Sequence, residues 1–188
     1  KNITKGATYI AGLDPSLGTG GDNAAIQIYE LPGMRQVAEW MHNKTSITEQ
    51  IRIMRSMLME VQDAAPESEI YWSVENNTLG EAALVVIAEM GEENIPGTLI
   101  SQPKSSNRGH RKGFTTTNKS KLEACSRLKN WIETGKMVVN SEALLQELKT
   151  FIARGSSFAA KSSETDDLVM ASVLVVRIAQ QVAQYDEV

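Results

Sequence analysis

The chain has 188 residues, of which 41% are hydrophobic and 22% charged, and its formal net charge is −4 at pH 7. This length and composition predict one globular domain with a sizeable core, and no apolar stretch is long enough to span a bilayer. A single cysteine, Cys125, excludes an internal disulfide and a thiolate zinc cluster, and only two histidines are present. We therefore expect a reducing, cytoplasmic setting and little thiol or histidine chemistry.

The charge is distributed unevenly along the chain. Residues 104–129 hold eight basic residues and one acid, a net charge of +7, so the rest of the chain carries −11. Such asymmetry favours a basic strip for a polyanion beside an acidic site for cations. The alternative for the same segment is a solvated loop and helix face without a partner.

The first predicted elements are three strands, over residues 8–14, 24–31 and 35–43. A glycine-rich turn at residues 15–22 joins the first two, and Leu31-Pro32-Gly33 marks the tight turn before the third. Because both connections are short, we predict an antiparallel meander.

A helix, a strand and a second helix follow. The first helix is predicted over residues 46–65, because its opening residues match the capping box and apolar residues then recur every three or four positions. A short apolar strand covers residues 70–74. A second capping-box pattern at Thr78 opens a helix that runs to about Gly91, a glycine suited to a helix C-terminus. Asn77 is a further candidate for the cap of this helix.

The second half of the chain alternates between short extended segments and helices. Extended segments are predicted at residues 98–102, 137–139 and 158–160. A polar, basic loop without periodicity covers residues 104–118. Helices are predicted over residues 122–135, 144–152 and 166–185. A meander followed by such alternation predicts one α/β domain over residues 1–188, with a mixed central sheet flanked by helices.

Carboxylates stand at three element ends that lie far apart in the sequence. Asp14 closes the first strand, Glu75 closes the fourth, and Asp166 and Asp167 open the last helix. The carboxyl ends of central strands in open α/β sheets face the crevice where ligands bind. Acids gathered there can hold two Mg²⁺ or Mn²⁺ ions roughly 3.5–4 Å apart for phosphoryl transfer, and the ions offset the repulsion between carboxylates.

Each acid also has a purely structural interpretation. Asp14 can organise the following turn through its side chain. Asp166 or Asp167 can complement the helix dipole, an effect of about 0.3–1 kcal/mol. Glu75, between an apolar strand and a helix, is the hardest to explain in this way, and the three positions together favour a metal site.

The glycine-rich turn contains Gly18-Thr19-Gly20-Gly21, but no Gly-Lys-Ser/Thr follows, so it is not a Walker motif. It resembles the phosphate loop of actin-like and sugar-kinase ATPases, which need two such domains and a longer chain. Asp22 is interpreted as a residue of this turn or as an acid near the metals. His110, in the basic loop, is interpreted as a phosphate or solvent contact.

The motifs resemble the C-terminal nuclease domain of the large terminase subunit of tailed bacteriophages, most closely the T4-like type. Three segments carry this resemblance, at residues 10–14 with the glycine-rich turn, 74–80 and 166–172. Residues 117–139, a basic helix followed by Gly-Lys and a short strand, also resemble the family pattern. The resemblance covers nearly the whole chain.

The resemblance implies an RNase H-like fold and a Mg²⁺- or Mn²⁺-dependent endonuclease that cuts concatemeric double-stranded viral DNA with low sequence specificity. The family's catalytic, metal-binding acids map onto Asp14, Glu75 and one of Asp166 and Asp167. We prefer Asp166 as the third ligand and keep Asp167 as a further candidate. In this scheme Asp14 bridges two ions, and the other acids hold one ion each.

The resemblance also implies partners. In full-length members an ATPase domain precedes this domain in the same chain, and the portal and the small terminase subunit complete the packaging machinery in the host cell cytoplasm. No P-loop is present in residues 1–188, so ATP hydrolysis is not expected of them. Six basic residues are expected to hold the DNA backbone electrostatically without reading bases: Lys104, Arg108, Arg111, Lys112, Lys119 and Lys121.

Two other functions remain open at this point. Another RNase H-like nuclease, such as a Holliday-junction resolvase or a transposase core, would prefer branched DNA or would transfer strands. A non-catalytic docking module would keep the fold but bind no divalent metal at the acids.

Overall fold

A five-stranded mixed sheet forms the centre of the computed structural model, which describes residues 3–103, 110–155 and 157–182. The strands are β1 (Thr8–Asp14), β2 (Ala24–Leu31), β3 (Arg35–His42), β4 (Glu69–Val74) and β5 (Thr98–Leu99). Their spatial order is β3-β2-β1-β4-β5. The first three form the predicted antiparallel meander, while β4 pairs in parallel with β1, and β5 with β4.

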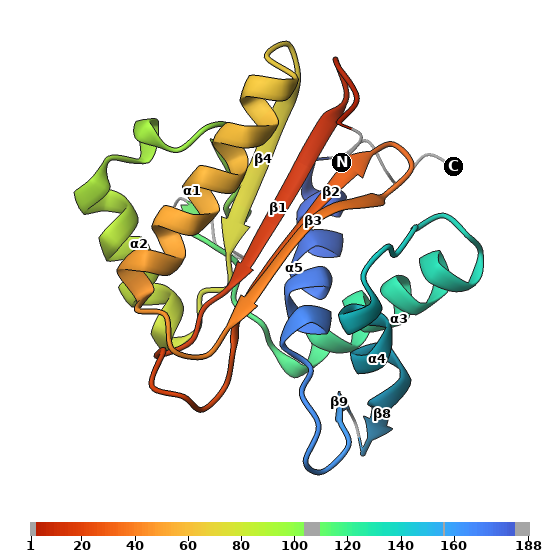
Figure 1. The fold of residues 1–188 in the computed structure, drawn as a ribbon. Helices are drawn as coiled ribbons and strands as arrows, with labels where there is room; N and C mark the ends of the chain where they lie inside the picture. Colours follow the sequence, from red (N-terminus) through yellow and green to blue (C-terminus); the bar gives the residue numbers. More distant parts are fainter. Residues whose placement is uncertain (1–2, 104–109, 156, 183–188) are drawn as a thin grey trace.

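Helices cover both faces of this sheet, as predicted (Figure 1). They are α1 (Ile47–Ala64), α2 (Thr78–Met90), the short 3₁₀ turn η1 (Glu92–Asn94), α3 (Asn118–Glu133), α4 (Glu142–Thr150) and α5 (Asp167–Gln181). The side chains of α1 and α2 share one core with the sheet, and α5 packs on the opposite face. α3 and α4 contact α5 from outside. Within the described part of the chain, no helix is long and apolar enough to cross a bilayer.

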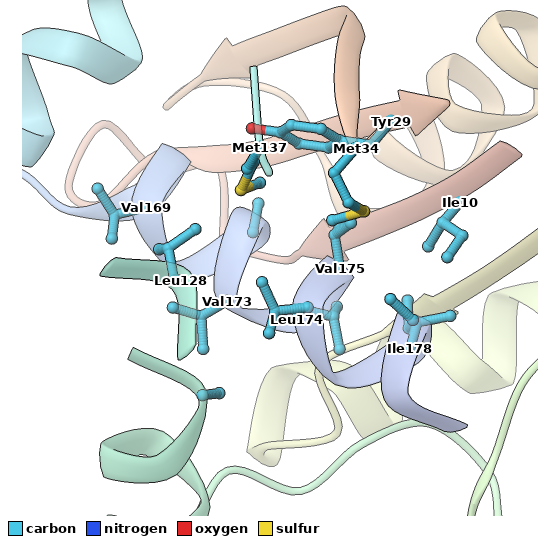
Figure 2. Close-up of a cluster of buried hydrophobic side chains, with 14 of the residues drawn as sticks. Ile10, Tyr29, Met34, Leu128, Met137, Val169, Val173, Leu174, Val175 and Ile178 are labelled. Carbon is cyan, nitrogen blue, oxygen red and sulfur yellow. The ribbon is translucent and has the colours of Figure 1, made fainter. Parts of the chain in front are cut away.

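The alternation of side chains along β1 decides on which face its last residue lies. Ile10 belongs to the apolar cluster between the sheet and α5, which Figure 2 shows. At Gly12 this helix comes so close that a Cβ atom would lie 3.0 Å from the carbonyl oxygen of Ala171. Because strand residues alternate between faces, Asp14 follows on the α5 side of the sheet.

The helix predicted over residues 144–152 is corrected by the structure. α4 (Glu142–Thr150) has the predicted length but begins and ends two residues earlier, and β8 (Phe151–Arg154) pairs antiparallel with β9 (Ser157–Ala160) as a hairpin. The rings of Phe151 and Phe158 stack with centroids 6.0 Å apart. The helical spacing of apolar residues therefore continues past the end of α4, because the hairpin also places apolar side chains such as Phe151 against the core.

Part of the basic connection forms a strand. β6 (Gln102–Pro103) pairs antiparallel with β7 (His110–Arg111). The strand predicted over residues 98–102 is therefore split between two sheets, and the loop predicted over residues 104–118 contains β7. Residues 104–109 lie outside the described part of the chain.

Several helix ends differ from the prediction. Of the two candidate caps of α2, Asn77 fills the position, because its side-chain oxygen accepts two first-turn amides at 2.9 and 3.0 Å. Thr117 caps α3, which therefore starts earlier than its apolar pattern indicates. α5 ends at Gln181, and the prediction for residues 183–185 lies outside the described residues.

The first turn of α2 lies against the end of β4. A Cβ atom on Gly80 would stand 1.8 Å from the carbonyl oxygen of Glu75, so only glycine allows this approach. In an exposed helix interior, Gly→Ala is favourable by about 1 kcal/mol. Here we expect Gly80→Ala to lower the free energy of unfolding by roughly 1–3 kcal/mol, because the backbone at Glu75 must move.

Urea unfolding of Gly80→Ala measures this effect. Gly33→Ala is the matched control, since a Cβ atom there would meet nothing within 4 Å. Equal or greater stability of Gly80→Ala would contradict the close approach.

Candidate metal centre

A pocket of about 340 Å³ lies at the carboxyl ends of β1 and β4. In Figure 1 the arrowheads of both strands point downward, and α5 also begins at its lower end in this view. The pocket is lined by Asp14, Glu75 and Asp167, three of the four predicted acids, together with residues of the glycine-rich turn and of the start of α2. Residues far apart in the sequence thus meet in one cavity, as the strand-end positions predicted.

Asp14 and Glu75 are brought together by the pairing of their strands. Leu13 lies opposite Val74 in the parallel register, and the Glu75 amide donates to the Leu13 carbonyl at 3.0 Å. Trp72 and Val74 belong to the core under α1 and α2, so Glu75 follows on the α5 side, like Asp14. The two carboxyl groups are close enough for Glu75 to raise the pKa of Asp14.

The backbone around Glu75 is held by a neighbouring segment. The Phe114 amide donates to the Val74 carbonyl at 3.0 Å, and the Asn76 amide donates to the Phe114 carbonyl at 2.8 Å. The Asn76 side chain donates to the Lys112 carbonyl at 2.7 Å. Glu75 itself is 9% exposed, so its direction is set by these contacts and not by solvent.

Asp167 reaches the pocket from the first turn of α5. Its Oδ2 accepts hydrogen bonds from the Asn23 side chain at 2.8 Å and from the Asn23 amide at 3.3 Å. Asn23 was not predicted as a site residue. Its only sequence signal is its position between the glycine-rich turn and β2, where an asparagine is usually interpreted as a turn residue.

Asp166 points elsewhere. It is the N-cap residue of α5, and its Oδ2 accepts the Ala160 amide of the adjacent hairpin at 3.2 Å. Among the described residues that line the pocket, the acid from this pair is Asp167. The structure therefore places Asp167 at the pocket, while the preference for Asp166 as the third ligand stays a prediction. The charge of Asp166 still acts on Asp14.

The site is electrostatically unfavourable without a cation. Burial raises the pKa of Asp14 well above its usual value, and the charge and hydrogen bond of Glu75 and the charges of Asp167 and Asp166 raise it further. Burial also raises the pKa of Asp167, while hydrogen bonds from Asn23 oppose this shift. No lysine or arginine is among the described residues that line the pocket. The charge of Glu75 acts on Arg177, which lies outside this lining, so the lining itself supplies no counter-ion for the carboxylates.

The residues fit a hard divalent cation. The acids supply only oxygen donors, which suit Mg²⁺ or Mn²⁺. In the described residues no group of three or more His, Cys, Asp and Glu side chains already converges closely enough to hold an ion. Asp14 is engaged with Glu75 and Asp167 with Asn23, so coordination by all three requires side-chain adjustment toward the pocket.

The glycine-rich turn does not form a phosphate cradle. The Ser16 amide donates to the Gln50 side chain at 3.3 Å, and the Gly20 amide donates to the Asn43 carbonyl at 2.7 Å. The Gly18 amide donates to the Ser16 hydroxyl at 3.3 Å. These N–H groups are turned toward the protein, so the similarity to ATPase phosphate loops is not supported by the geometry.

The predicted basic residues are spread over several elements. Lys104 and Arg108 lie outside the described residues, and Arg111 lies in β7. Lys112 forms an ion pair with Glu92 at 2.6 Å, a contact that directs it toward η1. The basic segment is therefore not one uniform strip in the part of the chain that the structure describes.

Lys119 and Lys121 lie in the first turn of α3. Lys119 is exposed and lies 4.0 Å from Glu123, a contact of little energetic weight. The Lys121 ammonium lies 5.9 Å from the centroid of the Phe151 ring in the β8–β9 hairpin. That hairpin also contacts Asp166, so Lys121 is on the side of the molecule that carries the acids.

A family model described as "Terminase RNaseH-like domain" matches residues 11–177. The magnesium-bound large terminase nuclease of thermophilic phage G20c has a TM-score of 0.65 at 17% identity, covering 96% of this chain and 82% of that one. The Mn-soaked, inhibitor-bound human cytomegalovirus terminase nuclease domain has a TM-score of 0.73 at 15% identity, covering 94% and 85%.

The Thermus phage P74-26 large terminase nuclease domain is also similar, with a TM-score of 0.61 at 17% identity, covering 96% of this chain and 80% of that one. At such low identities these likenesses establish the fold alone. The predicted RNase H-like fold is confirmed.

The raised pKa of Asp14 gives a prediction for stability. The folded protein holds this proton more tightly than the unfolded chain, so stability is lost as pH rises from the ordinary carboxyl range through the raised pKa. We expect Asp14→Asn to raise the Tm of the metal-free protein at neutral pH, where 1 kcal/mol corresponds to about 2–4 °C. The gain should shrink as the pH is lowered toward the ordinary carboxyl range.

Calorimetry in a chelating buffer tests this expectation. Asp63→Asn is the control, because Asp63 is an exposed acid of α1. An unchanged or lower Tm for Asp14→Asn at neutral pH would show that the carboxylates do not repel one another as inferred.

Proposed function

Because the chain belongs to the terminase RNaseH-like domain family, we propose that it is a metal-dependent endonuclease that cuts concatemeric double-stranded viral DNA during genome packaging. The observation that carries this proposal is the meeting of Asp14, Glu75 and Asp167 in one pocket whose described lining contains no basic side chain. The assignment to the T4-like type rests on the sequence motifs and stays a prediction.

The proposed roles follow from the positions of the side chains. Asp14, whose pKa is raised by its neighbours Glu75 and Asp167, would hold both ions. Glu75 and Asp167 would hold one ion each, and Asp166 would add negative charge nearby. A pair of Mg²⁺ or Mn²⁺ ions bound there would supply an activated water and stabilise the leaving oxygen. The magnesium of the G20c nuclease and the manganese soak of the cytomegalovirus domain support this choice of ions.

The binding of DNA is proposed to be electrostatic. Lys119 and Lys121 lie in the first turn of α3, and Lys121 contacts the hairpin that also contacts Asp166. Phosphate contacts by such side chains carry no sequence information. Lys104, Arg108 and Arg111 remain candidates of the same type, and Lys112 would first have to leave Glu92. Low sequence specificity follows, because none of these contacts distinguishes one base from another.

The wider assembly belongs to the same proposal. An ATPase domain in the same chain would deliver the DNA, and the portal and the small terminase subunit would position the complex in the host cell cytoplasm. The family assignment supports a place in DNA packaging, and the individual partners are proposed from the resemblance.

A plasmid-nicking assay with Mn²⁺ or Mg²⁺ tests the nuclease function. We expect Asp14→Ala to retain about 1% or less of the wild-type cleavage rate, the order of effect of losing a group that stabilises transition-state charge. Asp167→Asn should lose more activity than Asp166→Asn, because Asp167 lines the pocket. Circular dichroism checks that the variants are folded.

Retained cleavage in folded Asp14→Ala would refute the site. A larger loss of cleavage rate in Asp166→Asn than in Asp167→Asn would identify Asp166 as the third metal ligand. A preference for branched DNA, or strand transfer in place of hydrolysis, would favour a resolvase or a transposase core.

The salt dependence of DNA binding tests the role of α3. For each duplex phosphate contact, the slope of log K against log salt is about −0.9. We expect Lys119→Gln and Lys121→Gln each to weaken binding and to flatten this slope by up to that amount. Lys5→Gln is the control, since Lys5 is exposed and precedes β1, at the opposite end of the strand from Asp14. If the affinity and the salt slope of both variants equal those of the control, α3 does not contact the DNA.

A further inference from the structure

A further carboxylate, Glu147 of α4, lies buried beside the start of α5. It is 7% exposed. Its Oε2 accepts the Val169 amide at 3.0 Å, and its Oε1 accepts the Thr165 hydroxyl at 3.0 Å. Both of its oxygens are therefore engaged by the protein, which distinguishes Glu147 from the acids that line the pocket.

These contacts place Glu147 in the role that a helix N-cap normally fills. An N-cap aspartate usually accepts the amide of the second or third helical residue. Asp166 is the N-cap residue of α5 but makes no such bond, because its carboxylate accepts the Ala160 amide instead. Val169 is the third residue of the helix, and its amide is satisfied by Glu147 from α4.

Burial raises the pKa of the Glu147 carboxyl, and hydrogen bonds from Val169 and Thr165 oppose this shift. Burying a carboxylate is costly unless it is hydrogen-bonded. Glu147 receives a backbone amide and a hydroxyl, and it faces the positive end of the α5 dipole. On α4 it lies on the same stripe as the apolar residues Leu144 and Leu148, a position that would otherwise hold a hydrophobic side chain.

We infer that Glu147 is a positioning residue of the metal centre. Because Glu147 caps α5 from a neighbouring helix, the Asp166 carboxylate is free to accept the Ala160 amide of the hairpin. The same cap directs Asp167 into the pocket, where it meets Asn23. The inference rests on the proposed function, because the expected effect of Glu147 is on the affinity of that site for metal ions. Glu147 does not bind the ions itself. It fixes the turn of backbone from which Asp167 projects, and residues that orient metal ligands typically change metal affinity 10- to 100-fold when they are lost.

Metal titration by calorimetry tests this role on the chain as it stands. Glu147→Ala is expected to raise the Kd for Mn²⁺ by about 10- to 100-fold. Glu147→Gln keeps an oxygen that can accept the Val169 amide, so it should recover most of the affinity. Glu142→Gln, which removes an exposed carboxylate from the same helix, is the matched control and should leave the Kd unchanged.

Two results would overturn the inference. One is a Glu147→Ala protein with a lowered Tm but a wild-type Kd, which would make Glu147 a contributor to stability alone. The other is an equal loss of affinity in Glu147→Ala and Glu147→Gln, which would assign the effect to charge and not to capping. If Glu147→Ala does not fold, Thr165→Val removes one hydrogen bond to Glu147. It should raise the Kd severalfold, and an unchanged Kd would again overturn the inference.

Hydrogen exchange without metal separates this inference from the proposed function. Loss of the cap should speed exchange of the Val169 amide in Glu147→Ala by about tenfold or more, while Glu147→Gln should stay close to wild type. If the wild-type protein binds no Mn²⁺ and cuts no DNA, the nuclease proposal fails, and faster exchange in Glu147→Ala would still establish the cap. Unchanged exchange at Val169 would refute the cap whatever the nuclease assay shows.

Discussion

Repulsion between carboxylates in one pocket is the constraint on which the rest of the site depends. Asp14, Glu75 and Asp167 face a common cavity, and the first of these has a raised pKa because burial and its neighbours disfavour its charge. A protein can tolerate such a group only if rigid surroundings hold it in place and a cation offsets the charge when it arrives. The scaffold supplies the rigid surroundings, and the proposed ions would supply the offsetting charge.

The rigid surroundings come from close backbone packing. α5 lies against β1 at Gly12, and α2 starts against the carbonyl oxygen of Glu75 at Gly80. Both contacts are possible because glycine has no side chain at that point. The contact at Gly12 fixes α5, which carries Asp167, relative to the sheet, and the contact at Gly80 fixes the backbone of Glu75. The hydrogen bonds of Asn23 and Glu147 then set the start of α5. Packing thus positions the site before any ion is bound.

Much of the fold could be predicted from local patterns. The meander and the helices over both faces follow from alternation, helical spacing and turn residues. The errors arise where a local pattern is ambiguous. Phe151 fits a helical stripe equally well as a strand, and its stacking on Phe158 in the hairpin decides between them. Asn77 and Thr78 can both cap a helix, and only the geometry of the turn selects Asn77.

The sequence by itself determined the positions of the acids at element ends, the α/β class and the family motifs, because strand period and chain order are local properties. Only the tertiary structure decided that Asp167 lines the pocket while Asp166 turns to Ala160, since adjacent residues differ only in the direction that packing gives them. It also decided the roles of Asn23 and Glu147. Their hydrogen-bond partners lie 144 and 22 residues away, so no local pattern could identify those partners. The place of Glu147 on the apolar stripe of α4 indicates only that its side chain is buried.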